Sequence, residues 1–531
     1  MALITGSNPV ASESDRRLAV NRHGETGEPV AKTLGTLTAL KDPRQAGPFD
    51  GYDPKPYYCE LLGTDRQPGK ALVAVWQRLQ ALDVPTLLRR AADAERELFN
   101  LGITFTVYSD KDAIDRILPF DVIPRVITAA EWGVVEAGVI QRVRALNMFL
   151  WDIYHERHIL KDGTVPAALV LDNRNYRPEM IGFDPPHGTY IHINGTDLVR
   201  DGKGVFHVLE DNGRSPSGVS YVVENRHMMQ RAFPDLMQGL RVRPVSDYGE
   251  RLLGKLIDVA PAGVAQPSVV LLSPGVYNSA YFEHIFLARE MGVPLVEGRD
   301  LVVEHDHVFM RTVAGLAPVD VIYRRINDDF LDPEAFNPDS KLGVAGLMRA
   351  SKAGHVTLAN AVGTGVADDK AVYAYVPRII EYYLNEKPIL PNVETYICGE
   401  PEGLAFTLKN VETLVVKPVG ESGGYGIVVG PKATRAELDA VRAEITANPA
   451  NFISQPMVAL SVCPTLTPNG VVPRHVDLRP YAVTGKDTWV LPGGLTRVAL
   501  KEGSIIVNSS QGGGTKDTWV LEDGTIEECG T

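Results

Sequence analysis

Residues 415–427 read Val-Val-Lys-Pro-Val-Gly-Glu-Ser-Gly-Gly-Tyr-Gly-Ile, which places a lysine at the end of an apolar strand and a glycine-rich loop directly after it. Four of the seven residues from Gly420 to Gly426 are glycines. Glycine lets backbone N–H groups approach phosphate oxygens without a Cβ atom in the way, and Lys417 would add a positive charge. The stretch therefore predicts either a phosphate-binding hairpin or a plain surface turn, and the strand-borne lysine favours the hairpin.

Three other basic residues are candidates for the same anion site. Lys370 follows two aspartates at the predicted start of a helix, where a solvated first-turn residue is the alternative. Arg479 lies in Asp477-Leu478-Arg479 on a predicted strand and Arg497 lies on a later one, although alternating charge is also typical of a solvent-facing strand. Because arginine offers a fixed fork of donors to a transferring phosphoryl group, Arg479 and Arg497 are the candidate catalytic residues.

Two familiar nucleotide motifs are excluded. No Gly-Lys-Ser/Thr follows the glycine-rich loop, so the loop is not a Walker A sequence. Gly363-Thr364-Gly365 lacks the third glycine of a dinucleotide fingerprint.

An acidic set precedes all of these basic residues in the chain. Glu210 and Asn212 are two positions apart, so on a strand they face the same side, and Asp197 could lie on a neighbouring antiparallel strand. Carboxylate and amide oxygens are ligands that suit Mg²⁺. The set predicts a magnesium site or, equally, a hairpin with Asp and Asn as turn residues.

Composition narrows the class of protein. The chain has 531 residues, 44% of them hydrophobic and 22% charged, which predicts two or three packed units. A net charge of −13 argues against nucleic acid as the main partner. The four cysteines form no CxxC pair, and we find neither a membrane-length apolar run nor a signal-peptide pattern, so we expect a cytoplasmic protein without a membrane partner.

The periodicity of apolar residues predicts mixed secondary structure without an internal repeat. We predict helices over 129–160, 250–259, 281–291, 370–384 and 435–446, and strands over 167–171, 205–209, 220–223, 268–273, 301–303, 319–323, 414–416, 426–429, 452–458, 478–483 and 504–507. Strand and helix alternate between 268 and 323. This alternation predicts a small, largely parallel α/β unit with ligand-facing loops at the strand ends.

Taken together, the motifs resemble the ATP-grasp superfamily, and most closely the glutathionylspermidine synthetases and the circularly permuted ATP-grasp proteins of bacteria. The similarity to the permuted group extends to Tyr-Arg-Arg at 323–325, Asp-Asp-Phe-Leu-Asp-Pro at 328–333, Gly-Thr-Gly-Val-Ala-Asp-Asp-Lys at 363–370 and Asn-Ser-Ser-Gln-Gly-Gly-Gly at 508–514. The metal strands of an ordinary ATP-grasp chain come last, whereas here they precede the lysines. We find no amidase-like domain with a cysteine nucleophile, so the hydrolytic half of the bifunctional synthetases is missing.

The resemblance implies an α/β (α+β) fold, a circularly permuted ATP-grasp with a small parallel pre-ATP-grasp-like α/β domain. It divides the chain into a mobile tail at 1–45, a helical segment with the metal-binding half at 46–235, the α/β domain at 236–345 and the nucleotide-binding half at 346–531. ATP would contact Lys370, Lys417, a lid that includes Gly420, Ser422, Gly423 and Gly424, and an adenine segment of Gln455, Pro456, Met457 and Val458. By the same resemblance, Asp197, Glu210 and Asn212 would bind magnesium.

The implied activity is an ATP- and Mg²⁺-dependent carboxylate–amine ligase that forms an amide through an acyl phosphate and releases ADP. Its partners would be a small acid and a small amine, such as an amino acid or a peptide. Candidates for the acid site follow the ends of two predicted strands: Tyr277, Asn278, Glu283, Arg324 and Arg325. A structural ion pair with Asp328 or Asp329 is the alternative for the two arginines. The rival functions are an ATP-dependent phosphotransferase and a non-catalytic nucleotide-binding partner in a peptide-modifying complex.

Overall fold

The computed structural model describes residues 47–108, 113–419, 426–504, 507 and 513–524. Several predictions therefore lie outside the described residues: the tail at 1–45, the lid residues Gly420, Ser422, Gly423 and Gly424, and most of the stretch 508–514. The predicted strand at 504–507 is only partly described.

Helices form at α1 Val73–Gln80, α2 Val84–Asn100, α3 Ala129–Tyr154, α4 His158–Lys161, α5 Ala167–Leu171, α6 Val219–Ala232, α7 Pro234–Met237, α8 Tyr248–Asp258, α9 Tyr281–Met291, α10 Asp328–Leu331, α11 Leu347–Lys352, α12 Lys370–Leu384, α13 Pro401–Asn410 and α14 Arg435–Ala447. The predicted helices at 281–291 and 370–384 coincide with α9 and α12. The predicted helix from 129 ends six residues early, at Tyr154. It starts at a capping box, in which Thr128 and Glu131 each satisfy a backbone N–H of the other.

Two predicted strands are wrong, because residues 167–171 and 220–223 are helical in α5 and α6. Ser220 begins a β-branched and aromatic stretch, yet the carboxylate of Glu283 accepts hydrogen bonds from Gly218 N and Ser220 N and caps α6 from a distant part of the chain. In α5 only Val170 is buried. A short apolar run of this length is compatible with either structure, and tertiary contacts determine which one forms.

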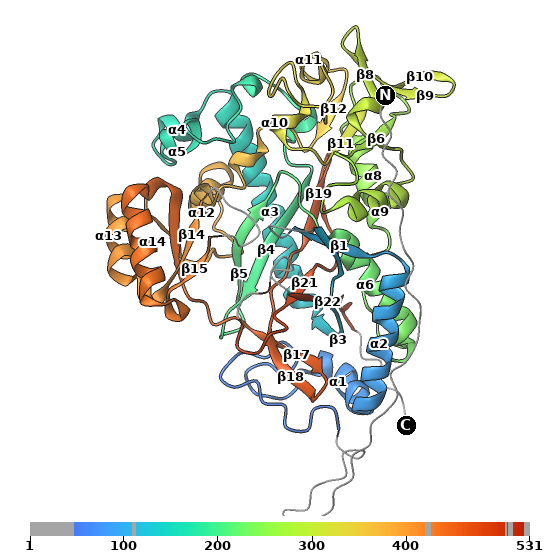
Figure 1. Cartoon of the computed structure of the whole chain (residues 1–531), viewed down its shortest axis with the longest axis vertical. Helices are drawn as coiled ribbons and strands as arrows, with labels where there is room; N and C mark the ends of the chain where they lie inside the picture. The colour runs from blue at the N-terminus through green and yellow to red at the C-terminus, as the bar shows by residue number, and fades with distance from the viewer. Residues whose placement is uncertain (1–46, 109–112, 420–425, 505–506, 508–512, 525–531) are drawn as a thin grey trace, which may run out of the picture. The chain divides into compact units, whose positions relative to one another are not determined.

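Two antiparallel sheets form the walls of the central region (Figure 1). One has the strand order β20-β19-β4-β5, from β4 Ile193–Arg200, β5 Phe206–Asn212, β19 Tyr481–Thr484 and β20 Thr488–Val490. The other has the order β13-β16-β14-β15, from β13 Tyr396–Ile397, β14 Leu414–Pro418, β15 Val428–Val429 and β16 Phe452–Pro456. In Figure 1 the second sheet lies between the helix pair α13 and α14 and the strand β5.

Alternation along β14 explains its two faces. Val416 packs with apolar residues of α13, α14 and β16 in a separate small core, whereas Val415 and Lys417 are only partly buried on the opposite face. Successive side chains of a strand point to opposite sides, so the lysine of the glycine-rich motif faces away from the helices.

The predicted parallel unit is present as the sheet β12-β11-β6-β7, in which every pairing is parallel. Its strands are β6 Val269–Leu272, β7 Leu295–Val296, β11 Val321–Arg324 and β12 Thr357–Ala359. The strand β12 lies beyond the expected boundary at 345. With its helices and several sheets, the chain has the predicted α/β (α+β) class.

The remaining described strands form two three-stranded sheets and two two-stranded antiparallel pairs. They are β1 Thr104–Tyr108 with β2 Ala113–Ile117, β8 Leu301–Glu304 with β9 His307–Thr312 and β10 Gly315–Val319, β17 Val462–Thr467 with β18 Gly470–His475, and β21 Thr496–Val498 with β22 Gly514–Val520 and β3 Phe120–Ile127. The strand β22 lies between β21 and β3, antiparallel to the first and parallel to the second.

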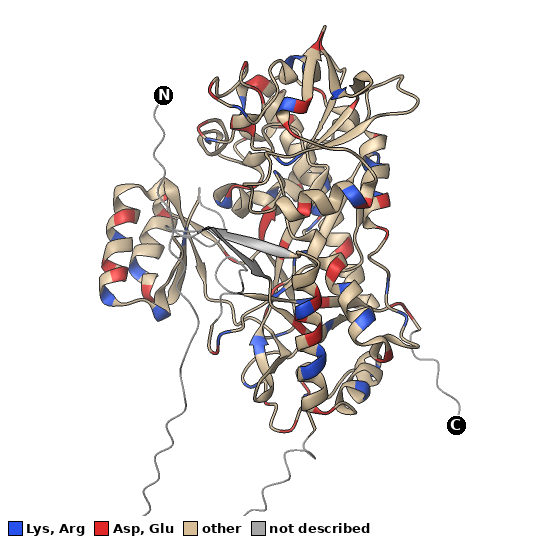
Figure 2. Ribbon diagram, turned by 45° about the vertical axis from the view of Figure 1, so that its right-hand side comes forward, with Lys and Arg blue, Asp and Glu red and all other residues tan. Residues whose placement is uncertain are grey.

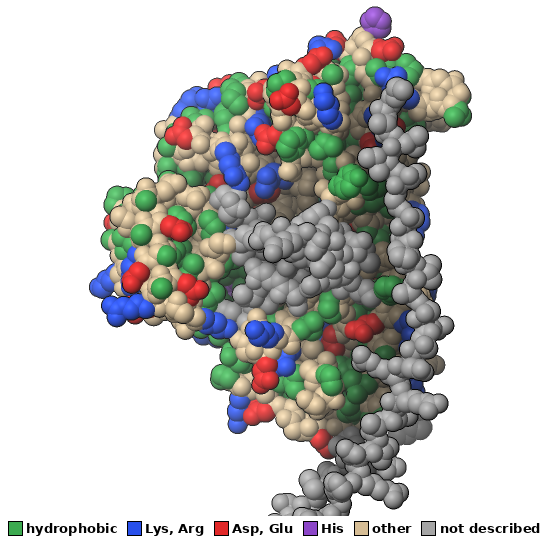
Figure 3. All heavy atoms as spheres, in the orientation of Figure 1, with side chains coloured by type: hydrophobic (Ala, Val, Ile, Leu, Met, Phe, Trp, Pro, Cys, Tyr) green, Lys and Arg blue, Asp and Glu red, His purple; other side chains and the backbone are tan. Residues whose placement is uncertain are grey.

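The surface of the described residues carries both signs of charge. Acidic and basic residues are interspersed along the helices (Figure 2), and on the face in Figure 3 hydrophobic side chains are scattered among charged ones. Within the described ranges, no helix has the length and apolar character needed to cross a bilayer.

Candidate functional site

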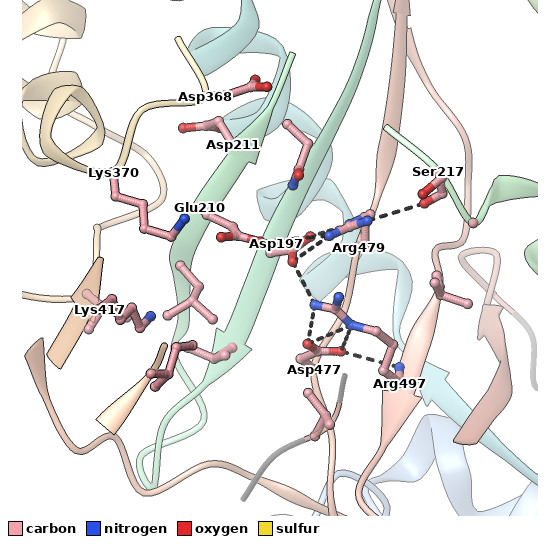
Figure 4. A pocket seen from close by; sticks show the side chains of 18 of the residues that line it. Asp197, Glu210, Asp211, Ser217, Asp368, Lys370, Lys417, Asp477, Arg479 and Arg497 are labelled. Carbon is pink, nitrogen blue, oxygen red and sulfur yellow. Dashed lines mark hydrogen bonds and ion pairs between the residues drawn. The ribbon is translucent and has the colours of Figure 1, made fainter. Parts of the chain in front are cut away.

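A cavity of about 520 Å³ opens between the two antiparallel sheets. Twelve of the predicted site residues line it: Asp197, Glu210, Asn212, Glu283, Lys370, Lys417, Gln455, Pro456, Met457, Val458, Arg479 and Arg497. These residues come from both sides of the chain's midpoint, so folding brings distant motifs into one site. Figure 4 shows the labelled side chains converging on this space.

The acidic residues are positioned by β4 and β5, which pair antiparallel with Asp197 opposite Glu210. The register shifts next to this pair, because Leu198 pairs with Val208 and leaves Leu209 as an extra residue. Such a bulge re-aims the side chains of a strand. Glu210 and Asn212 both line the cavity, and so does Asp211 between them.

Asp197 and Asp477 hold the two candidate catalytic arginines. Arg479 donates to both carboxylate oxygens of Asp197, with 2.8 Å between Nη2 and Oδ2. Arg497 donates to Asp197 Oδ2 at 2.6 Å and to Asp477 through Nε at 3.0 and 2.9 Å. Burial alone would raise the pKa of Asp197, but the two guanidinium groups lower it below its usual range. Both arginines are therefore fixed in place by buried carboxylates.

The two lysines approach from the opposite wall. Lys370 is the first residue of α12, whose N-cap Asp369 accepts hydrogen bonds from the backbone N–H groups of Ala371 and Val372. Lys417 lies on β14 opposite Ile453. Burial is the main cause that lowers the pKa of Lys417 to about 8; nearby Lys370 acts in the same direction, and Glu210 opposes both.

An apolar wall lies next to the lysines. It consists of Val393, Val415, Val429, Met457 and Leu460. Gln455, also on this side, donates through Nε2 to Thr395 Oγ1 at 2.9 Å. An apolar slot beside a cationic patch suits a ligand with a flat ring system at one end and several anionic groups at the other.

Glu210 differs from the other carboxylates around the cavity. The others each accept hydrogen bonds from an arginine or from backbone N–H groups: Asp197, Asp211, Glu283, Asp368, Asp369 and Asp477. Among the described residues, Glu210 forms an ion pair with Arg479 at 3.9 Å between Nη2 and Oε1, and Lys370 and Lys417 also act to lower its pKa. Burial and the neighbouring Asp197 raise the pKa of Glu210. It is the carboxylate with room for an added cation.

The predicted acid-site residues fall into three groups. Glu283 lines the cavity and forms a buried ion pair with Arg325, which also donates to Pro216 O at 2.6 Å. Arg324 is buried elsewhere, paired with Asp328 at 2.7 Å, which is the structural alternative considered for it. Tyr277 is 89% exposed. Asn278 accepts from Ala280 N at 2.9 Å within a turn, and neither of these two lines the cavity.

The sequence reasoning missed Asp477, Arg214 and Asp368 as cavity residues. Asp477 is two positions from Arg479, so the rule that placed Glu210 with Asn212 could have found it. Arg214 donates through Nε to Asp368 Oδ2 at 2.7 Å. The two residues are 154 positions apart, and no local pattern signals such a pairing.

Comparisons with known proteins give matches in sequence and in fold. The sequence profile of the family described as Circularly permuted ATP-grasp type 2 matches residues 124–499, a range that includes every described cavity residue named above from Asp197 to Arg497. An uncharacterized protein of Synechocystis sp. is 52% identical over 478 residues, covering 90% of this chain and 99% of that protein. An uncharacterized protein of Mycobacterium tuberculosis is 52% identical over 481 residues, covering 89% of this chain and 86% of that protein.

Two further matches extend the comparison. A Frankia alni protein provisionally named glutamate–cysteine ligase 2-3 is 43% identical over 497 residues, which cover 93% of this chain but 57% of that protein. A glutathione synthetase-like effector from Globodera pallida has a similar fold, with a TM-score of 0.50 at 10% identity over 83% of this chain and 98% of that chain.

Proposed function

Because the chain belongs to the circularly permuted ATP-grasp type 2 family, we propose that it is an ATP- and Mg²⁺-dependent ligase that joins a carboxylate to an amine. The observation that supports this most directly is the convergence of Lys370, Lys417, Glu210 and the arginine pair on one cavity. The provisional ligase name of the Frankia protein is in keeping with it. A kinship with glutathionylspermidine synthetases and a cytoplasmic location, where ATP is supplied, belong to the same proposal.

In this proposal the apolar wall holds the adenine ring and the lysines hold the phosphates. Met457 and Val415 contribute to that wall, and Lys417 follows two positions after Val415 on the same face of β14. Alternation on one strand thus supplies both an adenine contact and a phosphate contact. In the sequence, the glycine-rich loop follows shortly after Lys417.

The donor set fits a magnesium ion. Among the described residues, Glu210 has Arg479 Nη2 at 3.9 Å, beyond hydrogen-bond distance, and Asn212 donates through Nδ2 to Gly195 O at 3.2 Å, which leaves its amide oxygen as an acceptor. Asp197 already accepts three hydrogen bonds from arginines. We therefore propose Glu210 and Asn212 as the main ligands, with Asp197 as a contributor through its remaining lone pair. When bound, the ion neutralises phosphate charge and orients the γ-phosphate.

The chain's own residues would act mainly by positioning and by charge stabilisation. A carboxylate oxygen of the acid attacks the γ-phosphorus, the bond to the β-phosphate oxygen breaks, and ADP leaves. Arg479 and Arg497 offer fixed donors to the equatorial oxygens because Asp197 and Asp477 hold their guanidinium groups. The amine then attacks the acyl carbon of the acyl phosphate, loses a proton and displaces inorganic phosphate.

The experiment that tests this function is the melting temperature of the purified protein with ATP, with and without Mg²⁺. A ligand that binds only the folded state must raise the melting temperature, so we expect a rise that depends on Mg²⁺. Acid and amine pairs are then screened for ADP release. Transfer of ¹⁸O from a labelled carboxylate to phosphate identifies the acyl phosphate, whereas ATP-dependent phosphorylation without an amide product would favour the phosphotransferase.

The absence of any shift in melting temperature at saturating ATP and Mg²⁺ would contradict the proposed activity. It would favour the non-catalytic partner of a peptide-modifying complex instead.

A further inference from the structure

The cavity extends beyond the residues that the proposed phosphate chemistry uses. Asp368, at one end in Figure 4, lies away from Asp477 and Arg497, with Glu210 and Lys370 between them. Arg214, Asn175, Ser215 and Asn327 also line the cavity. Arg214 pairs with Asp368, which places its guanidinium group at this end. Neither the adenine wall nor the arginine pair accounts for these polar groups.

Arg214 is rigidly mounted. Its Nε donates to Asp368, which also accepts from Gly213 N, and the amide of Asn360 donates to the carbonyls of Gly213 and Arg214 at 2.7 and 3.2 Å. A methyl group on Gly365 would lie 2.8 Å from Arg214 Cδ and 2.9 Å from Asn175 Cβ. The side chains of Arg214 and Asn175 therefore lie next to each other over a glycine that leaves room for both.

The groups without a partner at this end include several donors. In the described part of the chain, Arg214 donates a side-chain hydrogen bond through Nε, and its Nη1 and Nη2 atoms have no hydrogen-bond partner. The side-chain amides of Asn175 and Asn327 also have no hydrogen-bond partner among the described residues. The guanidinium side chain is 35% exposed, so a ligand can reach it. Asn327 lies three residues after the end of β11, at the carboxyl end of the parallel sheet, where α/β sheets bind ligands.

The carboxylates at this end of the cavity already accept hydrogen bonds from other residues of the protein. Asp368 accepts from Gly213 N and Arg214, and Asp369 accepts from Ala371 N, Val372 N and the Asn173 amide at 2.8 Å. An ammonium group would find no uncommitted carboxylate here among the described residues. A carboxylate would find a planar fork of two guanidinium donors flanked by amides, which is the geometry that carboxylates bind best.

We propose that Arg214, with Asn175 and Asn327, binds a second carboxylate of the acid substrate, remote from the carboxylate that ATP activates. The substrate is then a dicarboxylic acid, an acidic amino acid or a peptide with a second carboxylate, and a simple monocarboxylate is a poor substrate. This inference rests on the proposed function, because it assigns the substrate class of the same cavity.

The test uses the full-length protein with ATP, Mg²⁺ and hydroxylamine, which converts an acyl phosphate to a hydroxamate without knowledge of the native amine. A series of dicarboxylates from malonate to adipate is compared with monocarboxylates of equal carbon number. We expect kcat/KM to favour the dicarboxylates by about ten- to a hundredfold, the size of a charge-assisted pair of hydrogen bonds. The same ranking is measured as melting-temperature shifts with a non-hydrolysable ATP analogue.

Two variants test whether Arg214 causes the preference for dicarboxylates. Arg214→Lys keeps a charge beside Asp368 but removes the fork, and we expect it to lose the preference by the same factor while ATP and Mg²⁺ still stabilise it. Arg299→Lys, at an arginine that is 79% exposed, is the matched control and keeps the preference. Equal kcat/KM values for mono- and dicarboxylates overturn the inference. A preference for dicarboxylates that persists in Arg214→Lys also overturns it. A wild-type protein that ATP and Mg²⁺ fail to stabilise contradicts the proposed function instead.

Discussion

At the scale of single residues, charge pairing separates the supporting carboxylates of the cavity from the one that can bind a ligand. Six acids are held by arginines or backbone N–H groups, whereas the ion pair of Glu210 with Arg479 spans 3.9 Å. Its raised pKa has burial as its main cause and Asp197 as the second. An ionised Glu210 therefore costs the unliganded protein stability, and a bound cation would remove that cost.

Glu210→Gln should abolish the Mg²⁺-dependent part of the ATP-induced rise in melting temperature. An acid whose pKa is raised on folding lowers stability as pH rises above its unfolded value, so the variant should be at least as stable as wild type at neutral pH. The measurement is a Mg²⁺ titration at fixed ATP, with Glu250→Gln at an exposed position of α8 as the control. An unchanged Mg²⁺ response in Glu210→Gln would remove this residue from the metal site.

Lys417 should make ATP affinity depend on pH. Its pKa of about 8 leaves it cationic below that value and neutral above it. Because phosphates favour the cationic form, ATP affinity should fall as pH rises through 8, by up to about tenfold per pH unit for one linked proton. The stability of the unliganded protein should change in the opposite direction, since a lysine whose pKa is lowered on folding destabilises the protein least at high pH.

The measurement for Lys417 is the dissociation constant of ATP on both sides of pH 8. Lys417→Arg keeps its charge throughout this range and should give a flat profile. If the pH dependence is the same in both proteins, another group must titrate.

At the scale of elements, the 26-residue helix α3 shows how neighbours decide the effect of one residue type. Gly133 and Gly138 both lie inside it. A Cβ atom on Gly133 would meet nothing within 4 Å, whereas one on Gly138 would lie 2.4 Å from Cγ of Leu390, a buried residue. The first glycine weakens the helix, and the second permits the close approach of another segment.

Gly133→Ala should therefore raise the free energy of unfolding by about 0.5–1 kcal/mol, the difference in helix propensity. Gly138→Ala should lower it by about 1–3 kcal/mol, because overpacking outweighs that gain. Urea unfolding of the two variants and wild type measures both changes. Stabilisation by both substitutions would mean that Leu390 moves aside at little cost.

The same scale explains how far the sequence could predict the structure. Helices with clear periodicity and caps, such as α9 and α12, were predicted with the bounds that the structure has. The stretch 220–223 was predicted wrongly because the cap on its helix comes from Glu283, 63 residues away from Ser220. Local patterns carry propensity and spacing, but they carry no information about a partner so distant in the chain.

At the scale of the whole molecule, the site is assembled from long-range pairings. The strand β19 pairs with β4, so that Tyr481 lies opposite Gly195, and Arg497 reaches Asp197 across 300 positions. The prediction that Lys417, Glu210 and Arg479 share a site came from the resemblance of the combined motifs to a known family, and all three residues line one cavity. Which carboxylates are already paired with a cation or an N–H group depends on contacts between distant parts of the chain. This pairing distinguishes Glu210 from Asp197 and places Arg214 beside Asp368, and it could not be predicted from composition.

The position of β22 between β21 and β3 has a consequence for biosynthesis. The strand β3, Phe120–Ile127, is buried along its whole length, and the strand that pairs with it in parallel is Gly514–Val520. At a ribosomal rate of about 5–20 residues per second, the nascent chain carries an unpaired apolar strand edge for roughly 20–80 seconds. Such an edge can associate with other chains, so the newly made protein should depend on chaperones during translation.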